Sequence, residues 1–342
     1  MFFLTGNSSD PRLYSVFNEA TSNFDKALSL MEIPGIRYNI SAPKILSNFT
    51  APIIFYKAKK HHSRTPTILW GNGYDGPQED GLPGFGKYVL ERGWNFVTYE
   101  GHGQNTPRRQ QNIGFKPNWW DVVTPIVDYL ISHPDVDTSR LALVGESFGG
   151  ILAPRTATHE KRFAAVIAID GAYNLRDVVL SEFPLELTAL YNSGNVTAFD
   201  TILNALRNNA SSPSSIRWGI FQGLWSFDTT SPFEWLTIAG NINLTQESVQ
   251  LVQEITSKVF IGSGQNDTSF PGQAPIVGQW FGDKVFFYNF TNDVGAGQHC
   301  QIGTDDYLTS VSLDWLTDVF EISQTTDGRF ISNTNSTSHF VR

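Results

Sequence analysis

The segment Gly145-Glu146-Ser147-Phe148-Gly149 decides the fold. It follows an apolar run at residues 141–144 and precedes a segment of helical character that runs to about residue 159. A serine between two such glycines, with a strand before it and a helix after it, is typical of a nucleophile elbow. The sharp turn strains the serine backbone, and small neighbours two residues away avoid a clash. The segment therefore predicts that Ser147 is a nucleophile above a helix N-terminus; a glycine-rich turn that merely begins a helix is the alternative.

A serine hydroxyl is a weak nucleophile that needs a base, and His299 is the best candidate among the seven histidines. In elbow enzymes the order along the chain is serine, acid, histidine. Only His299 stands in a loop after the last predicted strand, at residues 284–289, and before a predicted closing helix at about residues 305–320. We therefore expect the loop at residues 295–301 to carry the imidazole to Ser147.

Asp267 is the expected acid that orients the imidazole. It follows a predicted strand at residues 258–261 and a turn at residues 262–266, which places it at the carboxyl end of the sheet. Asp293 is nearer to His299 in the sequence and is the main competitor. We interpret Asp293 as a turn residue that closes the preceding strand, and we prefer Asp267.

The oxyanion hole should use two backbone N–H groups. One belongs to Phe148, and the other comes from the glycine-rich loop after the strand at residues 67–70. Tyr74 is the preferred donor in that loop and Gly73 is the alternative, because glycine lets the backbone approach a substrate closely. An ordinary tight turn is the structural alternative. We expect Gly73 and, further along, Glu79 to contact the substrate, although a solvated loop also explains Glu79.

Strand and helix patterns alternate along the chain, which predicts an α/β fold with a mostly parallel central sheet and helices on both faces. Residues 175–250 break this alternation and are rich in aromatic residues. We interpret them as an inserted helical lid whose rings form its core, a few of them, Trp225 included, also lining the pocket. The predicted divisions are an N-terminal helical segment at 1–34, a core at 35–174 and 251–322, the lid at 175–250, and a loose tail at 323–342.

Composition narrows the function. Hydrophobic residues make up 40% of the 342 residues, so a large core is expected, and the net charge is −9. An acidic chain without a basic run is a poor partner for nucleic acid or anionic membranes, and no apolar stretch reaches the length of a membrane helix. No metal-ligand spacing and no dinucleotide or phosphate-loop fingerprint is present, so no cofactor or metal is expected. The expected partner is a small-molecule substrate, and a homodimer stays open.

The single cysteine, Cys300, suits a reducing compartment, and the favoured location is the cytoplasm. Secretion stays open because Asn-x-Ser/Thr sequons are frequent. They occur at Asn7, Asn39, Asn48, Asn195, Asn209, Asn243, Asn266, Asn289 and Asn335.

Several segments together resemble one branch of the α/β-hydrolase superfamily. They are residues 73–76, 91–104, 121–129, 149–155 and 297–301. This branch includes the fungal heptaketide hydrolase of conidial pigment synthesis and a bacterial pseudooxynicotine-type carbon–carbon hydrolase. The resemblance covers roughly residues 11–322 and implies that Ser147, Asp267 and His299 match the family triad. It also implies that an N-terminal helical segment and the lid enclose the substrate, although Glu100 and Asn105 depart from the commoner aspartate and glycine.

These observations predict a serine hydrolase that cleaves an ester or a β-diketone-type carbon–carbon bond in a bulky secondary metabolite, derived from a polyketide in a fungal biosynthetic setting. The same triad could instead perform acyl transfer, cyclisation or lyase chemistry if the lid excludes water. A binding protein that keeps an inactive pocket is the third hypothesis.

Overall fold

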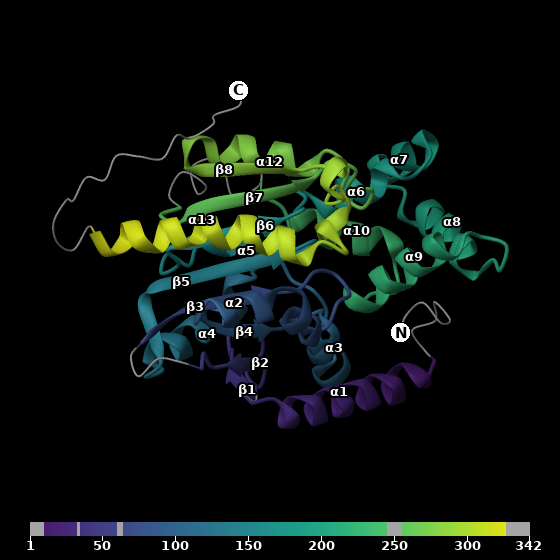
Figure 1. The fold of residues 1–342 in the computed structure, drawn as a ribbon. Helices are drawn as coiled ribbons and strands as arrows, with labels where there is room; N and C mark the ends of the chain where they lie inside the picture. Colours follow the sequence, from purple (N-terminus) through teal and green to yellow (C-terminus); the bar gives the residue numbers. More distant parts are fainter. Residues whose placement is uncertain (1–9, 33–34, 60–63, 245–254, 326–342) are drawn as a thin grey trace.

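The structure is a computed structural model that describes residues 10–32, 35–59, 64–244 and 255–325 (Figure 1). Its centre is an eight-stranded sheet with the order β1-β2-β4-β3-β5-β6-β7-β8. The antiparallel strand β2 separates β1 from a parallel set that runs from β4 to β8. The strands are β1 (Ile36–Ser41), β2 (Thr50–Tyr56), β3 (Thr65–Gly71), β4 (Asn95–Tyr99), β5 (Val136–Glu146), β6 (Ala165–Ile169), β7 (Lys258–Gly264) and β8 (Val285–Phe290).

Helices cover both faces of the sheet, because the central strands are apolar on both sides. Every residue of β3, β4 and β6 is buried. One face packs against α4 (Trp120–Ser132), α5 (Gly149–Ala157) and α12 (Gln273–Phe281). The other face packs against α2 (Lys87–Glu91) and the long closing helix α13 (Asp305–Thr325), which crosses the sheet in Figure 1. This arrangement confirms the predicted fold class.

The predicted helical lid is present between β6 and β7. Its helices are α6 (Leu175–Ser181), α7 (Leu185–Asn192), α8 (Val196–Asn208), α9 (Ser214–Ser226) and α10 (Pro232–Asn241). They gather at one end of the sheet, beyond the ends of β5, β6 and β7 (Figure 1). Trp235 and Phe227 are buried among them, and the Phe115 N–H donates to the Ser226 carbonyl at 2.9 Å, which ties the lid to the core. Residues 245–250 of the predicted lid lie outside the described residues.

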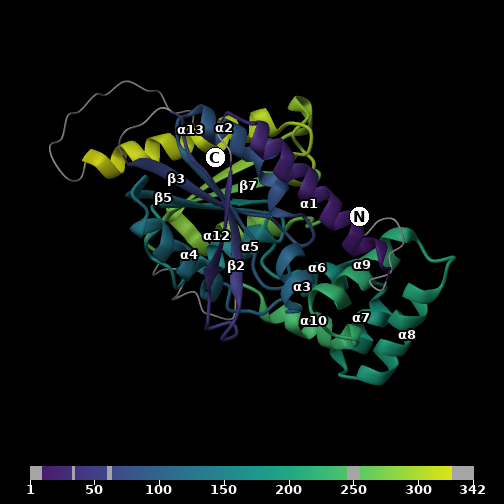
Figure 2. The ribbon, with the colours of Figure 1, turned by 90° about the horizontal axis from the view of Figure 1, so that it is seen from below.

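The N-terminal helix α1 (Arg12–Leu30) lies at the β1–β2 side and extends toward the lid (Figure 1 and Figure 2). Leu13, Phe17 and Leu28 form its buried face. The Arg109 guanidinium of α3 (Asn105–Gln111) lies 4.5 Å from the centre of the Phe17 ring. Arg37 of β1 adds a second attachment, because it pairs with Asp25 of α1 at 2.8 Å.

The structure corrects some local expectations. The helix α4 begins at Trp120 without a side-chain cap, although Asn118 stands two residues before it. The closing helix continues through Thr325, beyond the predicted start of the tail at residue 323. Three short elements between β3 and β4 were missed: η2 (Gln78–Asp80), η3 (Leu82–Gly86) and α2. They are too short for helical periodicity to be recognised, and glycine and proline lie between them and within η3.

Within the described residues, no helix combines the length and apolar character that crossing a membrane requires.

Candidate active site

The elbow holds Ser147 in a backbone conformation that serine rarely adopts. Its φ is +57°, in the left-handed region. A side chain at Gly145 would collide with the carbonyl of Gly149, and a Cβ at Gly149 would lie 2.8 Å from the Gly71 carbonyl oxygen. The Ser147 N–H donates to the Ile169 carbonyl of β6 at 2.9 Å, which fixes the turn to the neighbouring strand. The two glycines therefore allow a turn that lifts the serine out of the sheet.

The three predicted catalytic side chains meet at the carboxyl end of the sheet. Nε2 of His299 lies 2.8 Å from Oγ of Ser147, and Nδ1 of His299 lies 2.9 Å from Oδ1 of Asp267. Both distances are within hydrogen-bond range, in the order hydroxyl, imidazole, carboxylate. Because Ser147 follows β5, Asp267 follows β7 and His299 follows β8, the parallel strands themselves bring the three loops together.

Asp267 is held by several hydrogen bonds, and its competitor Asp293 makes none to the imidazole. Oδ1 of Asp267 also accepts the N–H groups of Ser269 and Phe270 at 2.8 and 2.9 Å. Asp293 lies exposed in the 3-10 turn η5 (Asn292–Val294), directly after β8. The hydrogen bond to Nδ1 of His299 therefore comes from Asp267, the residue preferred from the sequence.

The loop after β3 lies directly against the elbow. A Cβ at Gly73 would lie 2.8 Å from Cβ of Ser147 and 3.1 Å from the Phe148 nitrogen. The Gly73 N–H already donates to Oδ1 of Asn72 at 2.7 Å. Among the described residues, the N–H groups of Tyr74 and Phe148 have no acceptor. These two donors, rather than the N–H of Gly73, are available for a developing oxyanion.

Side chains on neighbouring segments hold the loop in place. The Gln104 amide donates to the carbonyls of Asn72 and Gly73 at 2.8 and 3.0 Å. The Tyr74 ring packs edge-on against Phe148, with the ring centroids 6.1 Å apart. A pre-fixed loop is what electrostatic stabilisation of an oxyanion requires, because the donors then need no reorganisation during the reaction.

Two carboxyl groups lie beside the elbow, the partly exposed Glu146 and the buried Asp170. Burial raises the pKa of Glu146 to about 7, although its hydrogen bond from the Trp70 indole N–H at 2.8 Å opposes this shift. Burial also raises the pKa of Asp170 to about 6, and hydrogen bonds from backbone N–H groups oppose it. Both groups therefore change charge in the range where histidine bases act.

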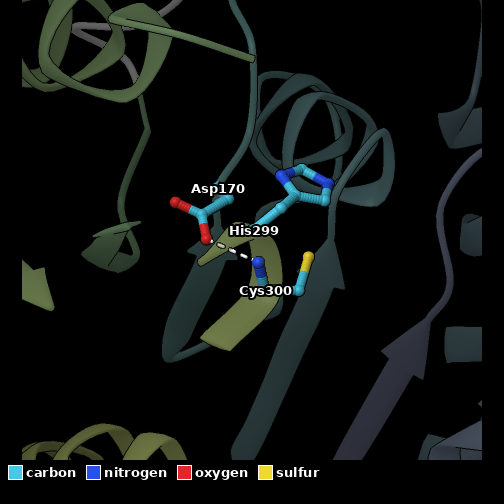
Figure 3. A group of neighbouring side chains, drawn as sticks. All are labelled: Asp170, His299 and Cys300. Atoms are coloured by element: carbon cyan, nitrogen blue, oxygen red, sulfur yellow. Dashed lines mark hydrogen bonds between the residues drawn. The ribbon is translucent and has the colours of Figure 1, made fainter. Parts of the chain in front are cut away.

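Asp170 is the site residue that the sequence analysis missed. It directly follows β6 and accepts the Cys300 N–H at 2.7 Å, in the turn that carries His299 (Figure 3). Its position offered a signal, because it ends the strand next to the nucleophile strand. Only the structure shows that its side chain turns toward the histidine loop rather than toward solvent.

Asp170, His299 and Cys300 have potential metal-ligand atoms within 4.8 Å of one another. The chemistry of this set does not suit a metal, since both imidazole nitrogens already bond to Asp267 and Ser147. Burial also raises the pKa of the Cys300 thiol well above its ordinary value, whereas a metal ligand must be the thiolate. This group therefore serves the hydrogen-bond network.

The two other predicted contact residues lie outside the triad. Oε1 of Glu79 pairs with Arg37 at 2.8 Å, and its Oε2 has no hydrogen-bond partner among the described residues. Trp225 of α9 stacks on Arg109, with the guanidinium carbon 4.8 Å from the ring centre. Glu79 and Arg109 both line one cavity. Trp225 does not line it and reaches it only through its contact with Arg109.

This cavity, which we name the acidic cavity, has a volume of about 360 Å³. Its wall on α1 includes Phe17, Thr21 and Phe24, and its opposite wall includes Asp75, Glu79, Asp80, Asn105 and Arg109. Asp75 follows Tyr74 directly, and partial desolvation raises its pKa while the charge of His299 lowers it. The cavity therefore begins next to the loop that lies against the elbow.

Comparisons with known proteins relate the chain to hydrolases. A family model described as the prolyl oligopeptidase family, peptidase S9, matches residues 118–209, which include the elbow. The 20-hydroxy-prefusarin hydrolase FUS2 of Gibberella moniliformis is 27% identical over 256 residues, covering 71% of this chain and 58% of FUS2. The hydrolase acrC of Aspergillus aculeatus is 25% identical over 358 residues, covering 95% of this chain and 79% of acrC. The chain thus spans little more than half the length of FUS2.

Solved structures show the same fold. The 2,6-dihydroxy-pseudo-oxynicotine hydrolase superposes with a TM-score of 0.66 at 17% identity, covering 88% of this chain and 72% of that one. The α/β hydrolase GrgF from Penicillium sp. sh18 gives a TM-score of 0.59 at 17% identity, covering 84% of this chain and all of GrgF. The protein has the α/β-hydrolase fold. Its predicted resemblance to the branch of fungal hydrolases and the pseudooxynicotine-type hydrolase is confirmed.

Proposed function

We propose that the protein is a serine hydrolase that cleaves an ester or a β-diketone-type carbon–carbon bond in a bulky secondary metabolite. One observation carries the proposal: the continuous hydrogen-bonded series from Oγ of Ser147 through the His299 imidazole to Asp267, at 2.8 and 2.9 Å. An activated serine needs an adjacent base, and the base needs a partner that fixes its orientation. The names of the relatives add support, since FUS2 and acrC are both hydrolases.

In the proposed reaction, Oγ of Ser147 bonds to a substrate carbonyl carbon while its proton passes to Nε2 of His299. The Tyr74 and Phe148 N–H groups donate to the carbonyl oxygen as it becomes an oxyanion. When the intermediate collapses, His299 returns the proton to the leaving group, which is an alkoxide oxygen or a stabilised carbanion. Water then adds to the acyl-enzyme, gives a proton to His299 and releases the acid, and Ser147 regains its hydroxyl hydrogen.

We further propose that the acidic cavity receives the part of the substrate remote from the reacting carbonyl. Its volume of about 360 Å³ is within the range of small-molecule sites. The Phe17 and Phe24 wall suits an apolar or aromatic surface, whereas the carboxylates of Asp75 and Asp80 suit hydroxyl donors. A hydroxylated aromatic polyketide carries both features, and α1 and the lid would enclose it.

A fluorophosphonate probe tests the serine chemistry without knowledge of the substrate. The wild-type protein should be labelled at Ser147, and Ser147→Ala should be unlabelled and should lose on the order of 10⁶-fold in turnover of any ester that the wild type cleaves. Ser139→Ala, an exposed position in β5, is the matched control and should react normally. A properly folded wild type that fails to react would favour the binding-protein hypothesis.

The fate of the acyl group distinguishes hydrolysis from the other uses of a triad. In ¹⁸O-labelled water, hydrolysis places the label in the released acid, because water attacks the acyl-enzyme. Acyl transfer, cyclisation and lyase chemistry release products without that label. If the enzyme reacts with the probe but its product carries no label, the triad assignment stands, and one of the other reactions takes the place of hydrolysis.

A further inference from the structure

We propose that Asp170 is a positioning residue that holds the His299 loop against the nucleophile and supplies a second negative charge beside the imidazole. The inference rests on the proposed catalytic roles of Ser147 and His299. It concerns how those two side chains are held in position relative to each other.

The Asp170 carboxylate joins three segments of the chain. One oxygen accepts the Gly264 N–H at the end of β7, at 2.5 Å. The other accepts the Cys300 N–H at 2.7 Å (Figure 3). It also accepts the Gln301 side-chain amide at 2.7 Å. Asp170 is 1% exposed, so water cannot take over these bonds. Three charge-assisted hydrogen bonds to one buried carboxylate make a rigid junction.

Each catalytic residue is adjacent to this junction. The Ser147 N–H donates to the carbonyl of Ile169, which precedes Asp170. The Asp267 N–H donates to the carbonyl of Gly264, whose own N–H bonds to Asp170. Cys300 directly follows His299. A displacement of the Asp170 carboxylate would therefore shift the nucleophile, acid and base relative to one another.

The junction also explains an unusual backbone. Asp170, Cys300 and Gln301 have φ values of +46°, +52° and +50°, in the region that favours glycine. Such conformations persist only where surrounding interactions impose them, and they are frequent at functional sites. The hydrogen bonds between Asp170 and residues 300–301 hold the backbone of both partners in these conformations.

The charge of Asp170 lies close to the base, since one of its carboxylate oxygens is within 4.8 Å of an imidazole nitrogen of His299. The other titratable groups around the imidazole come from several elements. They are Asp267 after β7, Asp75 after β3, Glu146 at the end of β5 and the neutral thiol of Cys300, and Asp305 of α13 acts in turn on Glu146. A nearby negative charge stabilises the imidazolium that forms as the serine is deprotonated.

Asp170→Asn tests both positioning and charge. It keeps the shape of the side chain but removes its negative charge, and it places an NH₂ group where one carboxylate oxygen accepts an N–H. The rate of fluorophosphonate labelling should fall by about 10²-fold through lost positioning. The titration midpoint of the His299 imidazole, followed by NMR in histidine-labelled protein, should move to lower pH, because a nearby negative charge is lost. A merely structural substitution would not move that midpoint.

Gln301→Met separates positioning from charge. It removes one hydrogen bond to Asp170, at a fully buried position, and leaves the carboxylate in place. The labelling rate should fall several-fold while the imidazole midpoint stays unchanged. Glu160→Gln is the control, because Glu160 is also buried and hydrogen-bonded, to Arg162 and Thr124, but it lies away from the triad. It should alter neither quantity.

The outcomes are distinct. A midpoint in Asp170→Asn equal to that of the wild type, with a labelling rate matching Glu160→Gln, overturns the inference. If Asp170→Asn does not fold, an unchanged labelling rate in Gln301→Met overturns it instead. A wild type that the probe does not label defeats the proposed function, whereas the NMR midpoint still reports the effect of Asp170 on His299 without any activity.

Discussion

Asp267 illustrates how single residues define this site. Three donors converge on its Oδ1: the His299 ring nitrogen and the N–H groups of Ser269 and Phe270. An ionised carboxylate accepts all three, and it holds the imidazole in the tautomer whose Nε2 faces the serine. The acid thus acts through orientation as well as charge.

Asp267→Asn should therefore lower kcat by roughly 10⁴-fold and leave the fold intact, because an amide selects the wrong tautomer. Steady-state kinetics with an ester that the wild type cleaves measures this loss. Asp293→Asn is the matched control and should remain within about twofold of wild type, since Asp293 is exposed in the η5 turn. The opposite pattern would transfer the role of the acid to Asp293.

Among single residues, the sequence predicts the positions of those that directly follow a strand in the expected chain order. Ser147, Asp267 and His299 each follow a recognisable strand, so the parallel sheet alone brings them together. The sequence does not contain the direction of a side chain at a loop, and for that reason Asp170 was missed although its strand was found. The same limit applies to Glu79, whose pairing with Arg37 depends on an element 42 residues away.

Among the elements, the strands were predicted most reliably. Each expected strand is present, because long apolar runs between turn residues have few alternatives in a buried sheet. Their ends differ, however: β5 begins at Val136, whereas the apolar run that signalled it begins near residue 140. The residues between are polar, and pairing of Val136 with Thr65 on β3 extends the strand beyond the hydrophobic pattern.

The helix α1 depends on a few attachments, of which Arg37 is central. Its guanidinium joins Asp25 of α1 to Glu79 of η2, with each contact at 2.8 Å. Glu79 and α1 form opposite walls of the acidic cavity. Arg37 therefore sets the separation of the two walls without touching the triad.

Arg37→Met should raise KM for a bulky aromatic ester several-fold, with kcat and the labelling rate of a small fluorophosphonate nearly unchanged. Loss of the ion pair also leaves Glu79 buried without a counter-charge, so a modest loss of stability should accompany the change. Lys57→Met is the control, because Lys57 forms an ion pair of the same length with Asp135 away from the cavity. An unchanged KM in Arg37→Met would show that α1 does not form part of the substrate site.

Across the whole molecule, several carboxyl groups near the site have raised pKa values. Burial raises the pKa values of Glu100 and Glu146 to about 7 and those of Asp80 and Asp170 to about 6. Each of these groups binds a proton more tightly in the folded than in the unfolded chain. The buried His102 acts in the opposite direction, because burial lowers its pKa to about 3. The total pH dependence of stability is therefore a sum of opposing contributions.

A comparison of the wild type with Glu146→Gln isolates one contribution. The folded protein keeps the Glu146 proton up to about pH 7, whereas the unfolded chain releases it near pH 4.3, the ordinary value for glutamate. The stabilisation from this group is thus present at low pH and is lost as the pH rises through 7. Glutamine stays neutral and still accepts the Trp70 indole N–H.

Glu146→Gln should therefore gain stability relative to wild type between pH 5 and pH 8, by on the order of 2 kcal/mol. Urea unfolding at several pH values measures the difference, and the contribution of His102 cancels because both proteins contain it. Glu91→Gln, at an exposed position of α2, should follow the wild-type curve. Parallel curves for wild type and Glu146→Gln would mean that Glu146 ionises as readily in the folded protein as in water, and that the elbow is open to solvent.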